Sequence, residues 1–156
     1  MHIETDNLLR PQVQALLQEH LDNMYELSPP DQVFALDLAK LRMPEITFWT
    51  IWDNNLLFGC GALKELSSTH GEIKSMRTPN AARRKGAGRA LLQHIILTSR
   101  NRGYKMLSLE TGSHPAFGAA QKLYNSHGFE LSGPFGDYLP NEHSVFMQLL
   151  LGSGAA

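Results

Sequence analysis

The chain has 156 residues, of which 42% are hydrophobic and 19% charged, and its formal net charge is −1. This balance is typical of a globular protein, and the near-zero charge argues against a general nucleic-acid-binding protein. We expect one domain over residues 1–151 and a disordered tail over residues 152–156. The sequence shows no secretory signal and no membrane-spanning run, and its one cysteine, Cys60, cannot form an internal disulfide, so a cytoplasmic protein is expected.

Apolar residues at helical spacing predict two helices at the start of the chain. The first is expected over residues 10–27, where Pro11 suits a first helical position and Ser28-Pro29-Pro30 stops the helix. A shorter helix is expected over residues 31–42, before Pro44.

Strand patterns follow. Residues 46–52 and 56–66 flank the turn signal Asp53-Asn54-Asn55 and predict a hairpin, and a third strand is expected over residues 72–78. Cys60 lies in the second strand and is expected to be a buried core residue rather than a nucleophile.

The second half alternates helices and strands. Helices are expected over residues 88–102 and 115–127, and strands over residues 105–111, 129–131 and 144–150. The predicted order, two helices, three strands, helix, strand, helix and two strands, indicates a mixed α/β fold.

A basic, glycine-bearing loop, Arg83-Arg84-Lys85-Gly86-Ala87-Gly88-Arg89, joins the third strand to the next helix. The first amides of a helix lack intrahelical acceptors, the helix dipole favours an anion there, and glycines let the backbone approach closely. The loop therefore predicts a pyrophosphate cradle, with a solvated basic loop as the alternative. A Walker motif is absent, and Leu91 stands where the dinucleotide fingerprint needs its third glycine.

This stretch resembles motif A of the GCN5-related N-acetyltransferase (GNAT) superfamily, Gln/Arg-x-x-Gly-x-Gly/Ala. Residues 120–129, Ala-Gln-Lys-Leu-Tyr-Asn-Ser-His-Gly-Phe, resemble a second family motif, and the runs 61–66, 71–78 and 107–112 are similar to bacterial acetyltransferases of the YsnE type. The resemblance covers residues 45–150. It implies a central, twisted, mostly antiparallel mixed sheet flanked by helices, with a V-shaped splay between the fourth and fifth strands.

The resemblance also implies an acyltransferase that uses acetyl-CoA as co-substrate and no metal. Backbone groups of Met76 and Thr78 would pair with the pantetheine, and the loop amides would bind the pyrophosphate. Phe117 stands where many family members have an asparagine that contacts the cofactor, and Ser113 or the backbone could substitute. The expected cofactor-binding residues are Met76, Thr78, Arg83, Arg84, Lys85, Gly86, Ala87, Gly88, Arg89 and Ser113.

The candidate catalytic residues also follow from the resemblance. Tyr124 matches the family tyrosine that protonates the leaving thiolate, and packing in the core is its alternative use. Glu72 is expected to act as the base, directly or through water, with Glu110 as its rival. His20 and His143 are weaker candidates, because such histidines more often lie at the surface or pack.

Acceptor contacts are expected from Glu110, Lys64 and Arg77. Cations that face the cleft would favour an acceptor with a carboxylate or phosphate. Strand alternation predicts that Lys74 shares a face with Glu72, Met76 and Thr78, whereas Arg77 lies on the opposite face. Trp49, Trp52 and Tyr138 could wall the acceptor site, although packing is their favoured use.

The expected activity is acetyl transfer to a primary amine of a small-molecule or amino-acid-like acceptor, by direct attack in a ternary complex. A protein or peptide N-acetyltransferase and a non-catalytic acyl-CoA-binding module are the alternatives. Neither a nucleic acid nor a membrane is an expected partner. A homodimer could form through the late strands, with contributions from Val145, Met147 and Leu149.

Overall fold

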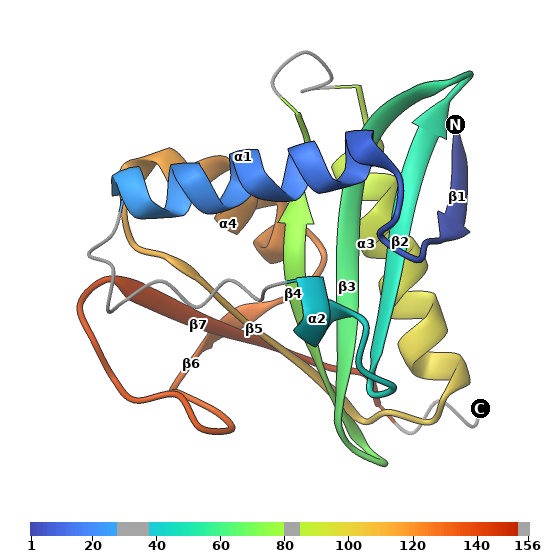
Figure 1. Cartoon of the computed structure of the whole chain (residues 1–156). Coiled ribbons are helices and arrows are strands. Elements are labelled where there is room, and N and C mark those ends of the chain that lie inside the picture. The colour runs from blue at the N-terminus through green and yellow to red at the C-terminus, as the bar shows by residue number, and fades with distance from the viewer. Residues whose placement is uncertain (28–37, 80–84, 153–156) are drawn as a thin grey trace.

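The computed structural model describes residues 1–27, 38–79 and 85–152. Within them, seven strands form one sheet in the order β1-β2-β3-β4-β5-β7-β6 (Figure 1). The strands are β1 His2–Thr5, β2 Ile46–Asp53, β3 Leu56–Ser67, β4 His70–Arg77, β5 Met106–Gly112, β6 Glu130–Ser132 and β7 Ser144–Leu150. The helices are α1 Pro11–Leu27, α2 Leu38–Leu41, α3 Ala87–Asn101, the 3₁₀ turn η3 Pro115–Phe117 and α4 Gly118–Ser126.

The predicted mixed α/β fold with a mostly antiparallel sheet is confirmed. Neighbouring strands pair antiparallel except β4 and β5, which pair parallel. The predicted elements have counterparts, but β1 was missed, because its four residues carry no strong pattern and extend the sheet only by pairing with β2. The expected helix over residues 31–42 is described only from Leu38, and residues 153–156 of the expected tail lie outside the described residues.

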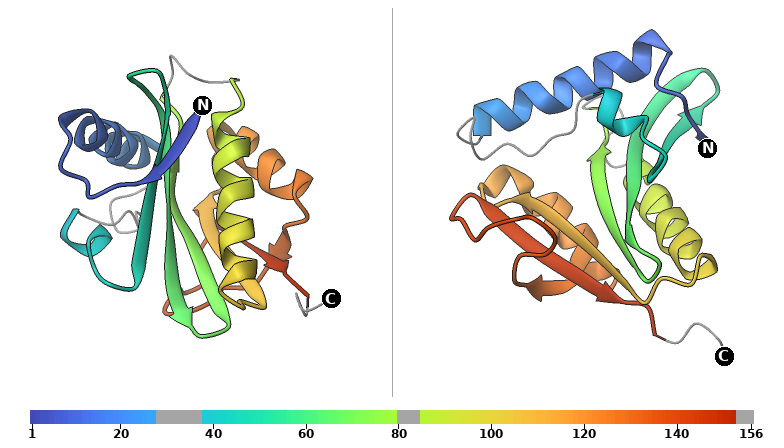
Figure 2. Two further views of the ribbon diagram at one scale, coloured as in Figure 1. Left: turned by 90° about the vertical axis from the view of Figure 1, so that its right-hand side faces the viewer. Right: turned by 60° about the horizontal axis from the view of Figure 1, so that its bottom comes forward.

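Two hydrophobic clusters cover the two faces of the sheet. Alternation along β3 sends Leu63 to the face covered by α3 and sends Cys60 and Ala62 to the face covered by α1 (Figure 2). The Cys60 thiol is fully buried, donates to the Ser75 carbonyl over 3.3 Å and has a pKa that burial raises to about 12. Its predicted role as a core residue is therefore confirmed.

The late strands contribute to the same core. Met147 and Leu149 are buried in the α3-side cluster, and Val145 packs against it. These side chains therefore face the inside of the molecule, and their expected contribution to a dimer is not supported by this placement.

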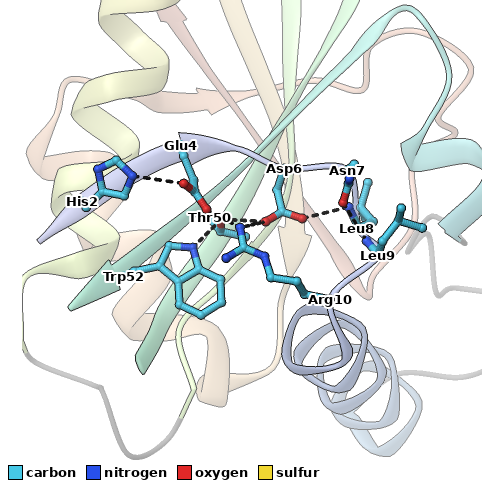
Figure 3. A network of polar contacts seen from close by, with 9 residues as sticks. All are labelled: His2, Glu4, Asp6, Asn7, Leu8, Leu9, Arg10, Thr50 and Trp52. Atoms are coloured by element: carbon cyan, nitrogen blue, oxygen red, sulfur yellow. Dashed lines mark hydrogen bonds and ion pairs between the residues drawn. The ribbon is translucent and has the colours of Figure 1, made fainter. Parts of the chain in front are cut away.

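A polar network ties the N-terminal segment to the sheet (Figure 3). The fully buried Asp6 carboxylate accepts hydrogen bonds from Leu8 N (2.8 Å), Arg10 Nη2 (2.8 Å) and Thr50 Oγ1 (3.0 Å). The Arg10 guanidinium lies 4.3 Å from the ring centre of Trp52, whose indole N–H donates to Thr50. This network fixes the start of α1, and it explains why Trp52 packs instead of walling a binding site.

Candidate active site

Strands β4 and β5 diverge after a short parallel ladder. They pair from His70↔Met106 to Ile73↔Leu109, whereas β4 continues to Arg77 and β5 to Gly112. Figure 2 shows the two halves of the sheet opening away from this ladder. The expected V-shaped splay is thus present, and it leaves one edge of β4 beyond Ile73 without a strand partner.

A bulge in β4 decides which side chains face this opening. Lys74 pairs with Ala62 and Arg77 pairs with Cys60, so two residues of β4 oppose one residue of β3. Ser75, within the bulge, has a positive φ of 55°. One extra residue reverses the alternation that follows it.

The predicted alternation of β4 is therefore wrong. Arg77 lies on the same face as Glu72 and Lys74, because its partner Cys60 shares a face with Ala62. Met76 lies instead on the other face and packs against the α3-side cluster. The sequence does not reveal the bulge, since serine carries no preference that would mark it.

A cleft of about 810 Å³ fills the opening between the splayed strands. The end of α1, the outer half of β4, the start of α3, the end of β5, α4 and Tyr138 line it. The sequence-predicted residues that it brings together are Glu72, Met76, Arg77, Thr78, Gly86, Ala87, Gly88, Arg89, Glu110 and Tyr124.

Other predicted residues lie away from the cleft or are not described. Lys64, Lys85 and Ser113 do not line it, and the Ser113 hydroxyl donates to the Glu142 carbonyl over 2.7 Å. Arg83 and Arg84 lie outside the described residues.

The N-terminus of α3 opens into the cleft. Its N-cap, Gly86, has a φ of 85° and provides no side-chain cap, so among the described residues no side chain caps the first-turn amides. Glycine adopts this left-handed conformation at little cost. Uncapped amides at a helix start suit an anionic ligand, and Arg89 adds positive charge in the first turn.

Three polar side chains form a closed triangle on the cleft wall. The Tyr138 hydroxyl donates to Glu72 Oε2 over 2.6 Å, and Lys74 Nζ donates to the same oxygen and to Tyr138, each over 2.9 Å. The side chains of Glu72 and Lys74 are only 4% and 9% exposed. Glu72 therefore uses one oxygen to hold both partners, and its Oε1 has no hydrogen bond among the described residues.

The sequence did not predict the hydrogen bonds of Tyr138 with Glu72 and Lys74, although it suggested that Tyr138 could line the acceptor site. Tyr138 comes from the segment between β6 and β7, 66 residues after Glu72. Its ring packs on Phe135 and Phe146, with ring centres 5.0 and 5.6 Å apart. No local pattern could have shown that this loop returns to β4.

Tyr124 and Glu110 lie on the opposite wall. Burial raises the pKa of Tyr124, and the nearby Glu110 carboxylate raises it further. The described residues offer the Tyr124 hydroxyl no hydrogen bond, and its ring packs edge-on against Phe129. Burial also raises the pKa of Glu110, which Ser144 and Lys74 partly offset.

Arg77 connects β4 to α1 across the cleft. Its Nη2 donates to Glu19 Oε1 over 2.8 Å and also to Asn23. His20, one helical position from Glu19, lines the cleft, and burial lowers its pKa to about 4. A neutral His20 is a weak proton acceptor, and His143 does not line the cleft.

Of the remaining aromatic candidates, Phe117 lines the cleft and Trp49 does not. Phe117 lines the cleft, and its ring lies where a side chain on Gly112 would point. Trp49 is buried with its ring 5.4 Å from His94. Trp49 is therefore a core residue, whereas Phe117 faces the site.

The residues that the structure describes contain neither a membrane-spanning helix nor a metal-ion cluster. None of their helices is long and apolar enough to cross a membrane. They also contain no cluster of three or more His, Cys, Asp or Glu side chains that could hold a metal ion.

The described sheet splays at the parallel pair β4 and β5, and the cleft in this opening holds an uncapped helix start together with the candidate acid and base residues. Solved acyltransferases share this fold. The chain belongs to the acetyltransferase (GNAT) family, whose model matches residues 13–129. Both the fold class and the family that the sequence predicted are confirmed.

Similar proteins support the same family. The chain is 54% identical to the uncharacterized N-acetyltransferase YsnE of Bacillus subtilis, over 94% of this chain and 97% of that protein. It is 35% identical to a protein of Azospirillum brasilense named IAA acetyltransferase, over 94% and 95% of the two chains. A solved GNAT family acetyltransferase from Elizabethkingia anophelis with acetyl-CoA bound shares the fold, with a TM-score of 0.65, 19% identity and coverage of 96% and 97%.

Proposed function

We propose that the chain transfers the acetyl group of acetyl-CoA to a primary amine of a small-molecule or amino-acid-like acceptor, by direct attack in a ternary complex. The observation that carries this proposal is the content of one cleft. It combines an uncapped helix start and a free strand edge with the acid and base candidates Glu72, Glu110 and Tyr124.

The donor end of the cleft fits a pyrophosphate and an extended acyl arm. The first amides of α3 would bind the pyrophosphate, with charge from Arg89 and from the loop residues Arg83 and Arg84. Backbone groups of Met76, on the free edge of β4, and of Thr78, just after the strand, would pair with the pantetheine amides as an added strand would. Amides of the same edge are candidate donors to the developing oxyanion.

Tyr124 is the proposed general acid for the leaving thiolate. A general acid must carry its proton at the operating pH, and burial together with Glu110 raises the pKa of Tyr124. Because no described residue holds its hydroxyl, that group can donate to a substrate in the cleft.

Glu110 is the better-placed base, and Glu72 the alternative. An amine must be neutral to attack, so the acceptor ammonium has to lose a proton. A carboxylate whose pKa is raised by burial, as for Glu110, accepts that proton more readily. Glu72 is already bound by Lys74 and Tyr138, which suits it to orienting the acceptor through its second oxygen.

The position of α1 favours a small acceptor over a protein. The helix lies across the sheet face that carries Glu72 and Arg77, and Arg77 ties it there through Glu19 and Asn23 (Figure 1). A peptide would need an open groove at this face. A non-catalytic acyl-CoA-binding module would bind acetyl-CoA and give no turnover.

A screen of primary amines with acetyl-CoA, followed by free thiol release, tests the proposal. We expect turnover with at least one small amine, and a Tyr124→Phe rate that is about a hundredfold lower with little change in acetyl-CoA affinity. Tyr25→Phe is the matched control, because Tyr25 is 51% exposed and lies outside the cleft. Absence of acetyl-CoA binding in calorimetric titration at millimolar cofactor would contradict the proposal.

A further inference from the structure

Two buried cations lie side by side on the acceptor side of the cleft. The side chains of Lys74 and Arg77 are 9% and 11% exposed, and both line the cleft. Their β3 partners, Ala62 and Cys60, are two residues apart, so the two backbone positions are about 7 Å apart. The bulge at Ser75 is what brings both charges to one face.

The described residues do not use all the hydrogen-bond donors of either cation. Lys74 Nζ donates to Glu72 and Tyr138 and retains a third N–H. Arg77 binds Glu19 and Asn23 through Nη2 alone. Its Nε is buried and has no partner among the described residues. Its Nη1 also makes no hydrogen bond with the described residues and, unlike Nε, is not fully buried, so it can donate to a ligand in the cleft.

The charges around the cleft suit a ligand that carries both signs. Lys74 and Arg77 are balanced by Glu72 and Glu19, so a dianion such as phosphate would add uncompensated charge to a buried site. A carboxylate adds one negative charge beside two cations with free donors. The ammonium of the same ligand would meet Glu110, on the facing strand, and so the ligand would bring no net charge.

We propose that the acceptor is an amine that also carries a carboxylate, as an amino acid does, and that Lys74 and Arg77 bind this carboxylate. The carboxylate would lie on the β4 wall, and the amine would point toward Glu110 and Tyr124. This assignment rests on the proposed acetyl transfer and adds the chemical class of the acceptor to it.

The alternative is that both cations are purely structural. Lys74 would then only hold Glu72, and Arg77 would only hold α1. In that case the enzyme would not distinguish an acceptor with a carboxylate from one without it. The ratio of kcat/KM for an amino acid to kcat/KM for its carboxamide therefore separates the two hypotheses.

The test compares matched acceptors with the intact wild-type protein. Each L-amino acid is assayed against its carboxamide and against the corresponding amine with a phosphate in place of the carboxylate, by thiol release with acetyl-CoA. We expect kcat/KM for the best amino acid to exceed that for its carboxamide by about ten- to a hundredfold, the size expected of hydrogen bonds between charged groups. The phosphate-bearing amine should be the poorer substrate.

Substitutions at Lys74 and Arg77 test whether these residues produce the preference for the amino acid over its carboxamide. Lys74→Met and Arg77→Gln should each reduce the ratio of acid to carboxamide by about tenfold or more, while Arg77→Lys should keep part of it. Lys64→Met is the matched control, because Lys64 pairs with Glu72 on the next strand but does not line the cleft. Acetyl-CoA affinity, measured by calorimetry, reports whether each variant is folded.

The outcomes separate this assignment from the proposed function. Turnover of carboxamides or phosphate-bearing amines that equals or exceeds that of amino acids overturns the carboxylate assignment and leaves acetyl transfer standing. Acetyl-CoA binding without turnover of any amino acid overturns it as well. If Lys64→Met lost the preference for the amino acid over its carboxamide as fully as Lys74→Met does, the assignment of the carboxylate to Lys74 and Arg77 would be wrong.

Discussion

At the scale of single residues, the Tyr138 hydroxyl joins two opposite charges on the cleft wall. It donates to Glu72 and accepts from Lys74, so it fixes the position of a carboxylate that has one free oxygen in the cleft. If Glu72 takes part in the proposed reaction, Tyr138 acts on it through Glu72 and is a positioning residue.

Tyr138→Phe retains the ring that packs on Phe135 and Phe146 and removes both hydrogen bonds. We expect kcat/KM for the amine to fall about tenfold, because Glu72 is no longer held, and acetyl-CoA affinity to stay unchanged. Steady-state kinetics and calorimetry measure the two quantities, with Tyr25→Phe as the exposed control. An unchanged kcat/KM would mean that the hydroxyl does not position Glu72.

Glu110 links catalysis to stability at the same scale. Burial holds its pKa above the ordinary carboxyl value. The native state therefore binds this proton more tightly than the unfolded state. The resulting stabilisation is fully present below the unfolded pKa and is lost as pH rises through the folded pKa. Ionisation of the buried Glu110 carboxyl therefore costs stability at pH values above its folded-state pKa.

Glu110→Gln should therefore be much less active than wild type and yet more stable. We expect its free energy of unfolding in urea to exceed that of wild type at pH 7, with the difference disappearing as the pH falls below the ordinary carboxyl pKa. The acidic limb of the wild-type kcat/KM profile should be absent from the residual activity of Glu110→Gln and present in Glu72→Gln. Glu130→Gln, at an exposed position on β6, should match wild type in both measurements.

At the scale of the element, the bulge in β4 decides which charged side chains of this strand share one face of the sheet. The extra residue places Arg77 on the face of Glu72 and Lys74, and it depends on a left-handed backbone at Ser75. This conformation costs a non-glycine residue conformational free energy, and the cost is largest for a β-branched residue.

Ser75→Gly and Ser75→Val form a matched pair that tests the bulge. Valine should lower the free energy of unfolding by about 1–2 kcal/mol, because it disfavours the left-handed backbone of the bulge. It should also reduce turnover, because a strand without the bulge would turn Arg77 to the opposite face. Glycine should leave both quantities close to wild type. Urea denaturation and the thiol-release assay measure them, and equal behaviour of the two variants would show that the bulge needs no left-handed residue.

At the scale of the whole molecule, two halves of one sheet meet at four parallel residue pairs. Strands β1–β4 lie on one side of this ladder and β5–β7 on the other, with the cleft between them. A ligand that contacts β4, α3 and α4 together would therefore stabilise the native state as a whole.

Acetyl-CoA at about a hundred times its Kd should stabilise the fold by about 2.7 kcal/mol, which corresponds to a rise in Tm of about 5–10 °C for a chain of this size. Differential scanning calorimetry measures the shift. Adenosine, which lacks the pyrophosphate and the acyl arm, should give little change. An equal shift with both compounds would locate binding away from the start of α3.

The sequence by itself determined the elements with strong local patterns and the family, and it predicted the loop before α3 as the cofactor end of the site. The helix periodicity of α1, the hairpin of β2 and β3 and the loop before α3 are local signals, because turn residues and apolar spacing act over a few residues. The splayed sheet and the candidates Glu72 and Tyr124 were predicted from the resemblance of two motifs to the family, and the structure places both residues in one cleft.

Only the tertiary structure decided the acceptor side. The bulge at Ser75 moved Arg77 to the opposite face from the one that strand alternation predicts. Tyr138 reached Glu72 from a distant loop, and burial between β5 and α4 raised the pKa of Glu110. Each of these three features depends on a strand register or on packing between segments far apart in the chain. The spacing of neighbouring residues encodes neither the register nor the packing.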